Sequence, residues 1–231
     1  MPMTGSDSLE GFLDKWRERW PEWSLVDRFV APELHRRTVA WFALLQEFDD
    51  MLNTAGDPLP ANAKLGWWSE ELRSWAGQRS RHPLGRVLEP VRAPWGQLAE
   101  ALPDLIEARD AIADPEQARR SLQRLATAVA AVEAALFDAP LSPEAGDAVL
   151  TQMLAQRMQD LGGAAVPAGS GGEREWQQAL LARWPARVAG PRPRRLYAVL
   201  ARGRLQARLR GGDYQPSPAG LLWRGWWAAR G

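Results

Sequence analysis

The residues best suited to chemistry lie where a helical pattern grades from apolar to polar along residues 32–54. One stripe of this expected helix consists of Val39, Phe42, Gln46, Asp49 and Asn53. Such a stripe suits a cavity that takes an apolar chain and holds an anionic group through metal ligands at its mouth. The alternative interpretation is a core helix whose last turn emerges into water.

The composition limits the classes of reaction. The chain has no cysteine and two histidines, His35 and His82, which argues against disulfides, thiolate chemistry and a histidine-rich zinc centre. Any catalysis would therefore rest on carboxylates, arginines and a hard metal ion such as Mg²⁺.

Helices are expected to position these side chains. Apolar residues recur at three- and four-residue spacing, and no long run alternates with period two, so the sequence predicts an all-α fold. The expected helices cover residues 7–20, 32–54, 60–77, 83–101, 103–113, 115–138, 142–161, 173–184, 193–211 and 217–229. Proline begins or breaks many of them, as it does at Pro94 and Pro115.

The organisation favours a single domain over residues 1–231. This length, with 45% hydrophobic and 25% charged residues, suffices for one substantial core. Residues 162–172 are rich in glycine and carry few bulky side chains, which predicts a flexible loop.

Three stretches, taken in order, resemble the squalene/phytoene synthase family. They are Glu47–Asn53, Lys64–Arg73 with its Trp67-Trp68 pair, and Arg81–Leu84. The resemblance implies an isoprenoid-synthase-like helical bundle in which two aspartate-rich helices face each other across a cavity. In that family Mg²⁺ bound to these helices holds two isoprenyl diphosphates for head-to-head condensation.

This resemblance assigns the first metal motif to Asp49, Asp50 and Asn53, with an asparagine where the family has a further aspartate. An asparagine carbonyl can coordinate Mg²⁺ but adds no charge, so we expect a weakened site. The substrate-binding residues that the resemblance implies are Phe42, Gln46 and Lys64, the last as a diphosphate contact.

The second motif departs further from the family. Asp160 is the only matching acid, because Gln152, Ala155 and Gln156 stand where the family has asparagine, arginine and aspartate. Neutral amides cannot replace bridging carboxylates, and we expect Gln152, Gln156 and Gln159 to form a polar stripe that faces water.

Three functions follow from these residues. The first is a squalene/phytoene synthase-like protein with impaired catalysis and an isoprenoid-binding or assembly role; some relatives in that family are assembly factors for respiratory complexes. The alternative is an active Mg²⁺-dependent isoprenyl diphosphate transferase that also uses acids such as Glu107, Asp110 or Asp160. The third is a helical module whose tryptophan-rich surface binds a protein.

The expected partners follow from charge and from the C-terminal residues. A net charge of +1 gives no case for nucleic acid, and no apolar run is long enough for a membrane span, so we expect a cytoplasmic protein. Peripheral contact with the inner face of the membrane would use basic and aromatic side chains, the alternative being a solvated face over buried tryptophans. These side chains are Arg194, Arg195, Arg202, Arg204, Arg208, Arg210, Trp223, Trp226 and Trp227.

Overall fold

The computed structural model describes residues 8–109 and 113–230, and helices dominate them throughout. The helices are α1 (Leu9–Arg19), α2 (Trp23–Val26), α3 (His35–Leu52), α4 (Leu59–Ala76), α5 (Gly85–Leu88), α6 (Trp95–Ala101), α7 (Asp104–Glu107), α8 (Pro115–Leu136), α9 (Ala145–Leu161), α10 (Glu173–Ala182), α11 (Arg192–Leu209) and α12 (Pro218–Arg230). Short 3₁₀ turns lie at Asp27–Phe29, Pro32–Leu34 and Gly162–Ala165. The all-α prediction is confirmed, and the arrangement as an isoprenoid-synthase bundle stays a prediction.

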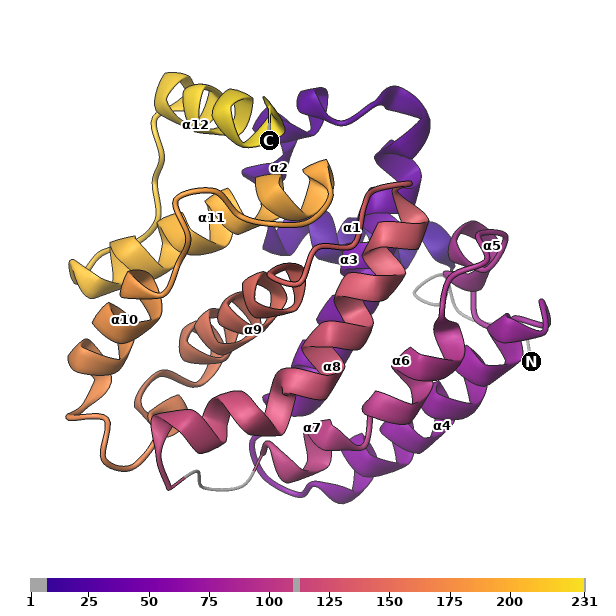
Figure 1. Ribbon diagram of the computed structural model, residues 1–231, viewed down its shortest axis with the longest axis horizontal. Helices are drawn as coiled ribbons and strands as arrows, with labels where there is room; N and C mark the ends of the chain where they lie inside the picture. The colour runs from indigo at the N-terminus through magenta and orange to yellow at the C-terminus, as the bar shows by residue number, and fades with distance from the viewer. Residues whose placement is uncertain (1–7, 110–112, 231) are drawn as a thin grey trace.

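Helix α3 is the centre of the molecule. Every residue from Thr38 to Leu44 is buried, so this part of the helix is enclosed on all sides. A helix that is apolar on all sides must be covered on all sides, and α1, α4, α5, α7 and α9 pack against it. Figure 1 shows α3 behind α8, with α9 and α6 on either side of α8.

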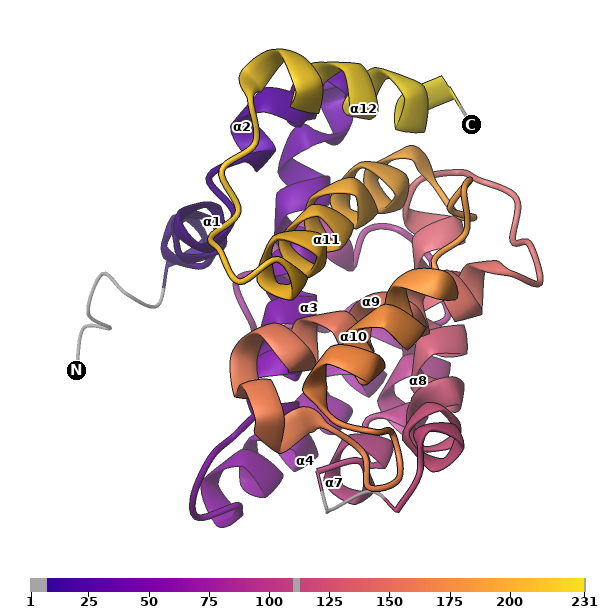
Figure 2. The same cartoon turned by 90° about the vertical axis from the view of Figure 1, so that its left-hand side faces the viewer.

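Helix α9 connects the packing of α8 with that of α11. This helix packs against α8 on one side and against α11 on the other, while α12 lies over α11 (Figure 2). The buried residues form one cluster that extends from Leu13 in α1 to Leu221 in α12. Its largest fully buried members are Trp16, Trp20, Trp41, Trp68, Trp75 and Trp95.

Local sequence explains where several helices begin. The Ser8 hydroxyl accepts a hydrogen bond from the Gly11 amide at 3.2 Å, and the Asp114 carboxylate accepts one from the Gln117 amide at 2.7 Å. Both are side-chain N-caps, and Pro115 occupies the first turn of α8, where its missing amide hydrogen costs nothing.

Two expected helices were wrong in extent. Residues 83–101 form α5 and α6 instead of one helix, because Pro90 and Pro94 interrupt the backbone hydrogen bonding between them. The helix expected over 103–113 ends as α7 at Glu107, and residues 110–112 lie outside the described residues.

Two further features bear on the predictions. Residues 162–172 begin with a 3₁₀ turn and include Gly162, Gly169, Gly171 and Gly172 at positive φ; the flexibility of this loop stays a prediction. No helix in the described ranges is long and apolar enough to cross a membrane.

Candidate functional site

The predicted acidic residues do converge. The Asn53 side-chain amide donates a hydrogen bond of 2.8 Å to Asp160, which joins the end of α3 to the end of α9. Gln46 donates to Asp50 at 2.9 Å, and Gln156 donates to Asp160 at 3.0 Å. The two helices that the family resemblance singled out therefore meet at their carboxylate-bearing ends.

Asp49 lies at the centre of this acidic cluster, defined as Asp49, Asp50 and Asp160. Burial raises the pKa of the Asp49 carboxyl well above its ordinary value, and the charges of Asp160 and Asp50 raise it further. Within the described residues, no group donates a hydrogen bond to this carboxyl that would offset the repulsion.

Helix α1 supplies cations to the same cluster. Arg19 lies 2.6 Å from an Asp160 oxygen and 3.5 Å from an Asp50 oxygen, so a single guanidinium bridges α3 and α9. Lys15 lies 3.5 Å from Asp50 and 3.4 Å from Glu47. Burial alone would lower the pKa of Lys15, but Glu47 and Asp50 outweigh burial and raise it. Two cations of the protein therefore stand where a bound metal ion would have to neutralise the carboxylates.

Lys64 is also paired within the protein. Its amine lies 2.5 Å from a Glu47 oxygen. Burial by itself would raise the pKa of Glu47, but the hydrogen bond and charge of Lys64, together with Lys15, lower it. Lys64 therefore lies at the α3–α4 contact, with its charge matched by a buried carboxylate.

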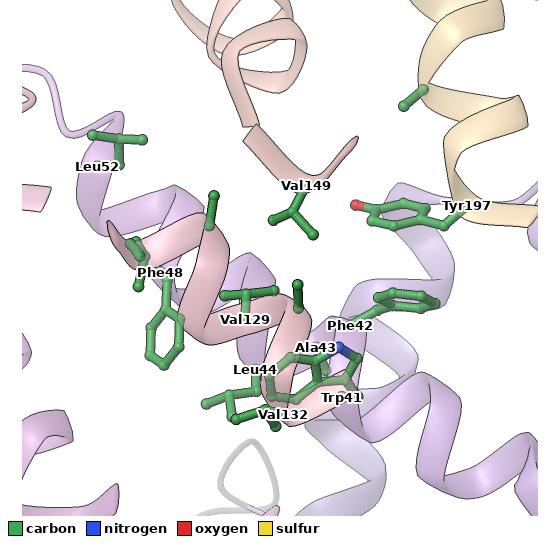
Figure 3. Packing of buried hydrophobic residues seen from close by; sticks show 14 of the residues in the cluster. Trp41, Phe42, Ala43, Leu44, Phe48, Leu52, Val129, Val132, Val149 and Tyr197 are labelled. Carbon is green, nitrogen blue, oxygen red and sulfur yellow. The ribbon is translucent and has the colours of Figure 1, made fainter. Parts of the chain in front are cut away.

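The space beside Asp49 is small. Its cavity measures about 20 Å³ and is lined by residues that include Phe48, Val129, Val149 and Tyr197. Figure 3 shows these four side chains, which come from α3, α8, α9 and α11. Phe42 does not line this cavity: its ring is fully buried and packs at 4.4 Å from Tyr197 and 5.6 Å from Trp16. Such a volume holds about one water molecule, whereas ligand sites measure roughly 300–1,000 Å³.

A buried ion pair closes the inner end of the site. Arg194 in α11 donates to both oxygens of Glu133 in α8, one of these bonds measuring 3.0 Å, and to Gln152 in α9 at 2.9 Å. Trp41 donates to the same Glu133 carboxylate at 2.8 Å. Four helices are thus joined by one polar network whose members are all buried.

The expected water-facing stripe of glutamines was wrong in part. Gln152 and Gln156 are buried, and their amides have partners inside the protein. Gln152 accepts a hydrogen bond from Arg194, and Gln156 donates one to Asp160. Arg194 was likewise expected among surface arginines, and its burial removes it from any membrane contact. A lone Glu133 within the apolar run 128–136 was the available sequence signal for this network.

The paired tryptophans behave as expected from helical geometry. Trp68 is buried, whereas Trp67 is 39% exposed, so one indole packs and its neighbour spans an edge. Consecutive residues of a helix point in different directions, so the two indoles cannot both point inward.

The described residues do not fit a Mg²⁺ site that holds diphosphates. No group of three or more histidine, aspartate or glutamate side chains among them is arranged to bind a metal ion. Arg19, Lys15, Gln46, Asn53 and Gln156 already contact the oxygens of Asp50 and Asp160. Asp110, named as an additional acid for an active transferase, lies outside the described residues.

Comparison of the chain with protein-family models finds no match. Comparison with curated proteins and with solved structures finds none either.

Proposed function

We propose that this chain is a noncatalytic, squalene/phytoene synthase-like helical protein that serves as a scaffold or assembly factor. The observation that carries this proposal is the pairing of the acidic cluster with Arg19 and Lys15 from the protein's own helix α1. Head-to-head condensation requires Mg²⁺ and cationic groups to absorb the charge of departing pyrophosphate. Carboxylates that are already neutralised by the chain have little charge left to offer such ions.

The small cavity favours a scaffold over an isoprenoid carrier. The space beside Asp49 measures about 20 Å³, and the aromatic side chains Phe48 and Tyr197 line it. An isoprenoid tail would have to displace several buried aromatic side chains. The buried hydrophobic residues instead pack in one cluster that includes those of α3.

The alternative function is an active Mg²⁺-dependent isoprenyl diphosphate transferase. It is favoured by the Asp49 carboxyl, to which no described group donates a hydrogen bond. This function requires α1 to leave the cluster so that Asp49, Asp50 and Asp160 become free to bind metal.

We place the protein in the cytoplasm, in peripheral contact with the inner face of the membrane. The feature that supports this location is α12, on which Trp223 and Trp227 are 60% and 52% exposed. Tryptophan side chains of this kind favour the boundary between water and lipid headgroups.

The test is release of pyrophosphate from farnesyl and geranylgeranyl diphosphates in the presence of Mg²⁺. We expect no release above the buffer blank from the full chain, or from an Arg19→Gln variant in which a cation has been removed from the cluster. Release that needs Mg²⁺ and disappears in Asp49→Ala, but not in the exposed-acid control Asp14→Ala on α1, would establish the transferase instead.

A further inference from the structure

A groove is lined by residues of α11 and α12. In Figure 2, α12 lies at the end of the molecule opposite α4. The volume of the groove is about 560 Å³, and residues 184–188 also line it. This volume falls within the roughly 300–1,000 Å³ of sites that bind small molecules. The groove is separate from the acidic cluster and from its small cavity.

Packing on the inner side of α12 fixes which residues face outward. Leu221 and Gly225 are buried, and a Cβ atom at Gly225 would lie only 3.0 Å from Phe29 and 3.1 Å from Val26. Helix α12 therefore lies close against α2 and the turn that follows it. This orientation leaves Trp223 and Trp227 on the rim of the groove.

The rim is an ordered aromatic surface. The rings of Trp223 and Trp227 lie 6.1 Å apart, and Trp226 stacks on Trp223 at 5.2 Å. Arg230 lies over the Trp226 ring at 3.7 Å. Large apolar rings held in place beside cations are suited to the interfacial region of a bilayer.

The groove carries positive charge without a matching acid. Arg187, Arg195, Arg202 and Arg224 line it, and no aspartate or glutamate does. Arg195 is hydrogen-bonded to the end of α12: it donates to the Ala228 carbonyl at 2.7 Å and to the Ala229 carbonyl at 3.2 Å. The other three arginines form no ion pair within the described part of the chain, and the buried Nε of Arg202 has no hydrogen-bond partner there. A buried donor without an acceptor, in a groove lined by arginines alone among charged residues, is suited to bind an anion.

We propose that this groove binds the phosphate headgroup of an anionic phospholipid while Trp223 and Trp227 enter the bilayer interface. Arg202 contacts the phosphate from the groove floor, and Arg187 and Arg224 contact it from the sides. A phospholipid satisfies both features of the site, because its phosphate matches the arginines and its acyl chains match the exposed indoles. The inference rests on the membrane-peripheral location proposed above and is independent of the loss of catalysis.

The test is co-sedimentation of the full chain with vesicles of phosphatidylcholine, with and without phosphatidylglycerol. We expect binding to the anionic vesicles, about fivefold weaker binding for Arg202→Gln, since one basic side chain near such a surface contributes about that factor, and still weaker binding for Trp223→Ala/Trp227→Ala. The matched controls, Arg73→Gln and Trp67→Ala, make the same substitutions at exposed positions on α4 and should bind as the unmodified chain does. Circular dichroism checks that each variant is folded.

The possible outcomes distinguish the proposed phosphate site in the groove from the proposed location at the membrane. Binding to anionic vesicles that Arg202→Gln and Arg73→Gln weaken equally would overturn the groove while leaving the peripheral location intact. Absence of binding to either type of vesicle would overturn both. Inorganic phosphate serves as the soluble probe: if it binds in calorimetry and depends on Arg202 while the vesicles do not bind, the groove is a phosphate site and the lipid proposal fails.

Discussion

Asp49 is buried beside Asp160 and Asp50, and this makes its ionisation unfavourable in the folded protein although Arg19 and Arg194 partly offset the effect. Its pKa is raised, chiefly by burial and then by Asp160 and Asp50, so the folded state holds the proton more tightly than the unfolded state does. The contribution of this group to stability is therefore fully present below its unfolded pKa of about 3.9 and is lost as pH rises through the folded value.

Replacement of Asp49 by asparagine should remove this loss. We expect Asp49→Asn to be more stable than the unmodified chain at pH 7, with the difference shrinking as the pH falls towards 4. Urea unfolding at a series of pH values measures it, and Asp213→Asn, at an exposed position, controls for a general effect of charge. A gain that is the same at all pH values would contradict the account.

Breaking the buried Glu133–Arg194 pair should destabilise the folded protein. Glu133→Gln would leave the Arg194 charge buried without a counterion, and removing one partner of such a pair costs about 3–5 kcal/mol. Urea unfolding should show this loss, whereas Glu10→Gln, which breaks the exposed pair with Arg36, should cost less than about 1 kcal/mol. Equal effects of the two substitutions would show that the buried network does not hold α8 and α11 together.

Close packing of α5 against the end of α4 requires a residue without a side chain at position 85. A Cβ atom there would lie 2.3 Å from the Ser80 Cβ and 3.1 Å from the Trp75 ring. Ser80 cannot retreat easily, because its amide and hydroxyl both donate to Glu89, at 2.8 Å and 2.5 Å. Helix α5 can therefore lie against the end of α4 only if this position lacks a side chain.

Gly85→Ala should consequently destabilise the fold by about 1–3 kcal/mol, as overpacking of a buried site does. Gly66→Ala is the matched control, because a Cβ atom in the middle of α4 meets nothing within 4 Å and alanine favours a helix by about 1 kcal/mol. The comparison is made by thermal unfolding of the two variants. If Gly85→Ala proved as stable as Gly66→Ala, the close packing of α5 would be wrong.

At the scale of elements, apolar periodicity predicted the long helices well. Those of α1, α3, α4, α8, α9, α10, α11 and α12 were predicted within three residues at each end. The four-residue helix α2 was missed because Trp23–Val26 is too short to show a period. The break between α5 and α6 was missed because apolar residues continue at helical spacing on both sides of Pro90 and Pro94, which interrupt the helix.

The candidate site was less accessible to sequence reasoning. The resemblance brought Asp49, Asp50, Asn53 and Asp160 to one place, and they do lie together. The pairing of Arg19 with Asp160 joins residues 141 positions apart, and no local pattern encodes such a contact. The cations of α1 were therefore missed although their partners were named.

At the scale of the whole molecule, three helices that are distant in sequence, α1, α3 and α9, converge on one charged cluster. A bundle centred on α3 brings the acids together, and α1 pairs with two of them, Asp50 and Asp160. We therefore propose that this cluster serves the stability of the fold and that ligand binding takes place in the groove between α11 and α12.

The most direct test is calorimetric titration of the unreactive thio analogue of farnesyl diphosphate into the full chain, with and without Mg²⁺, beside Asp49→Ala. We expect no Mg²⁺-dependent binding heat for either protein, because Arg19 and Lys15 pair with Asp160 and Asp50 and the adjoining cavity measures about 20 Å³. Mg²⁺-dependent binding by the unmodified chain that is lost in Asp49→Ala would contradict this expectation and would show a working diphosphate site.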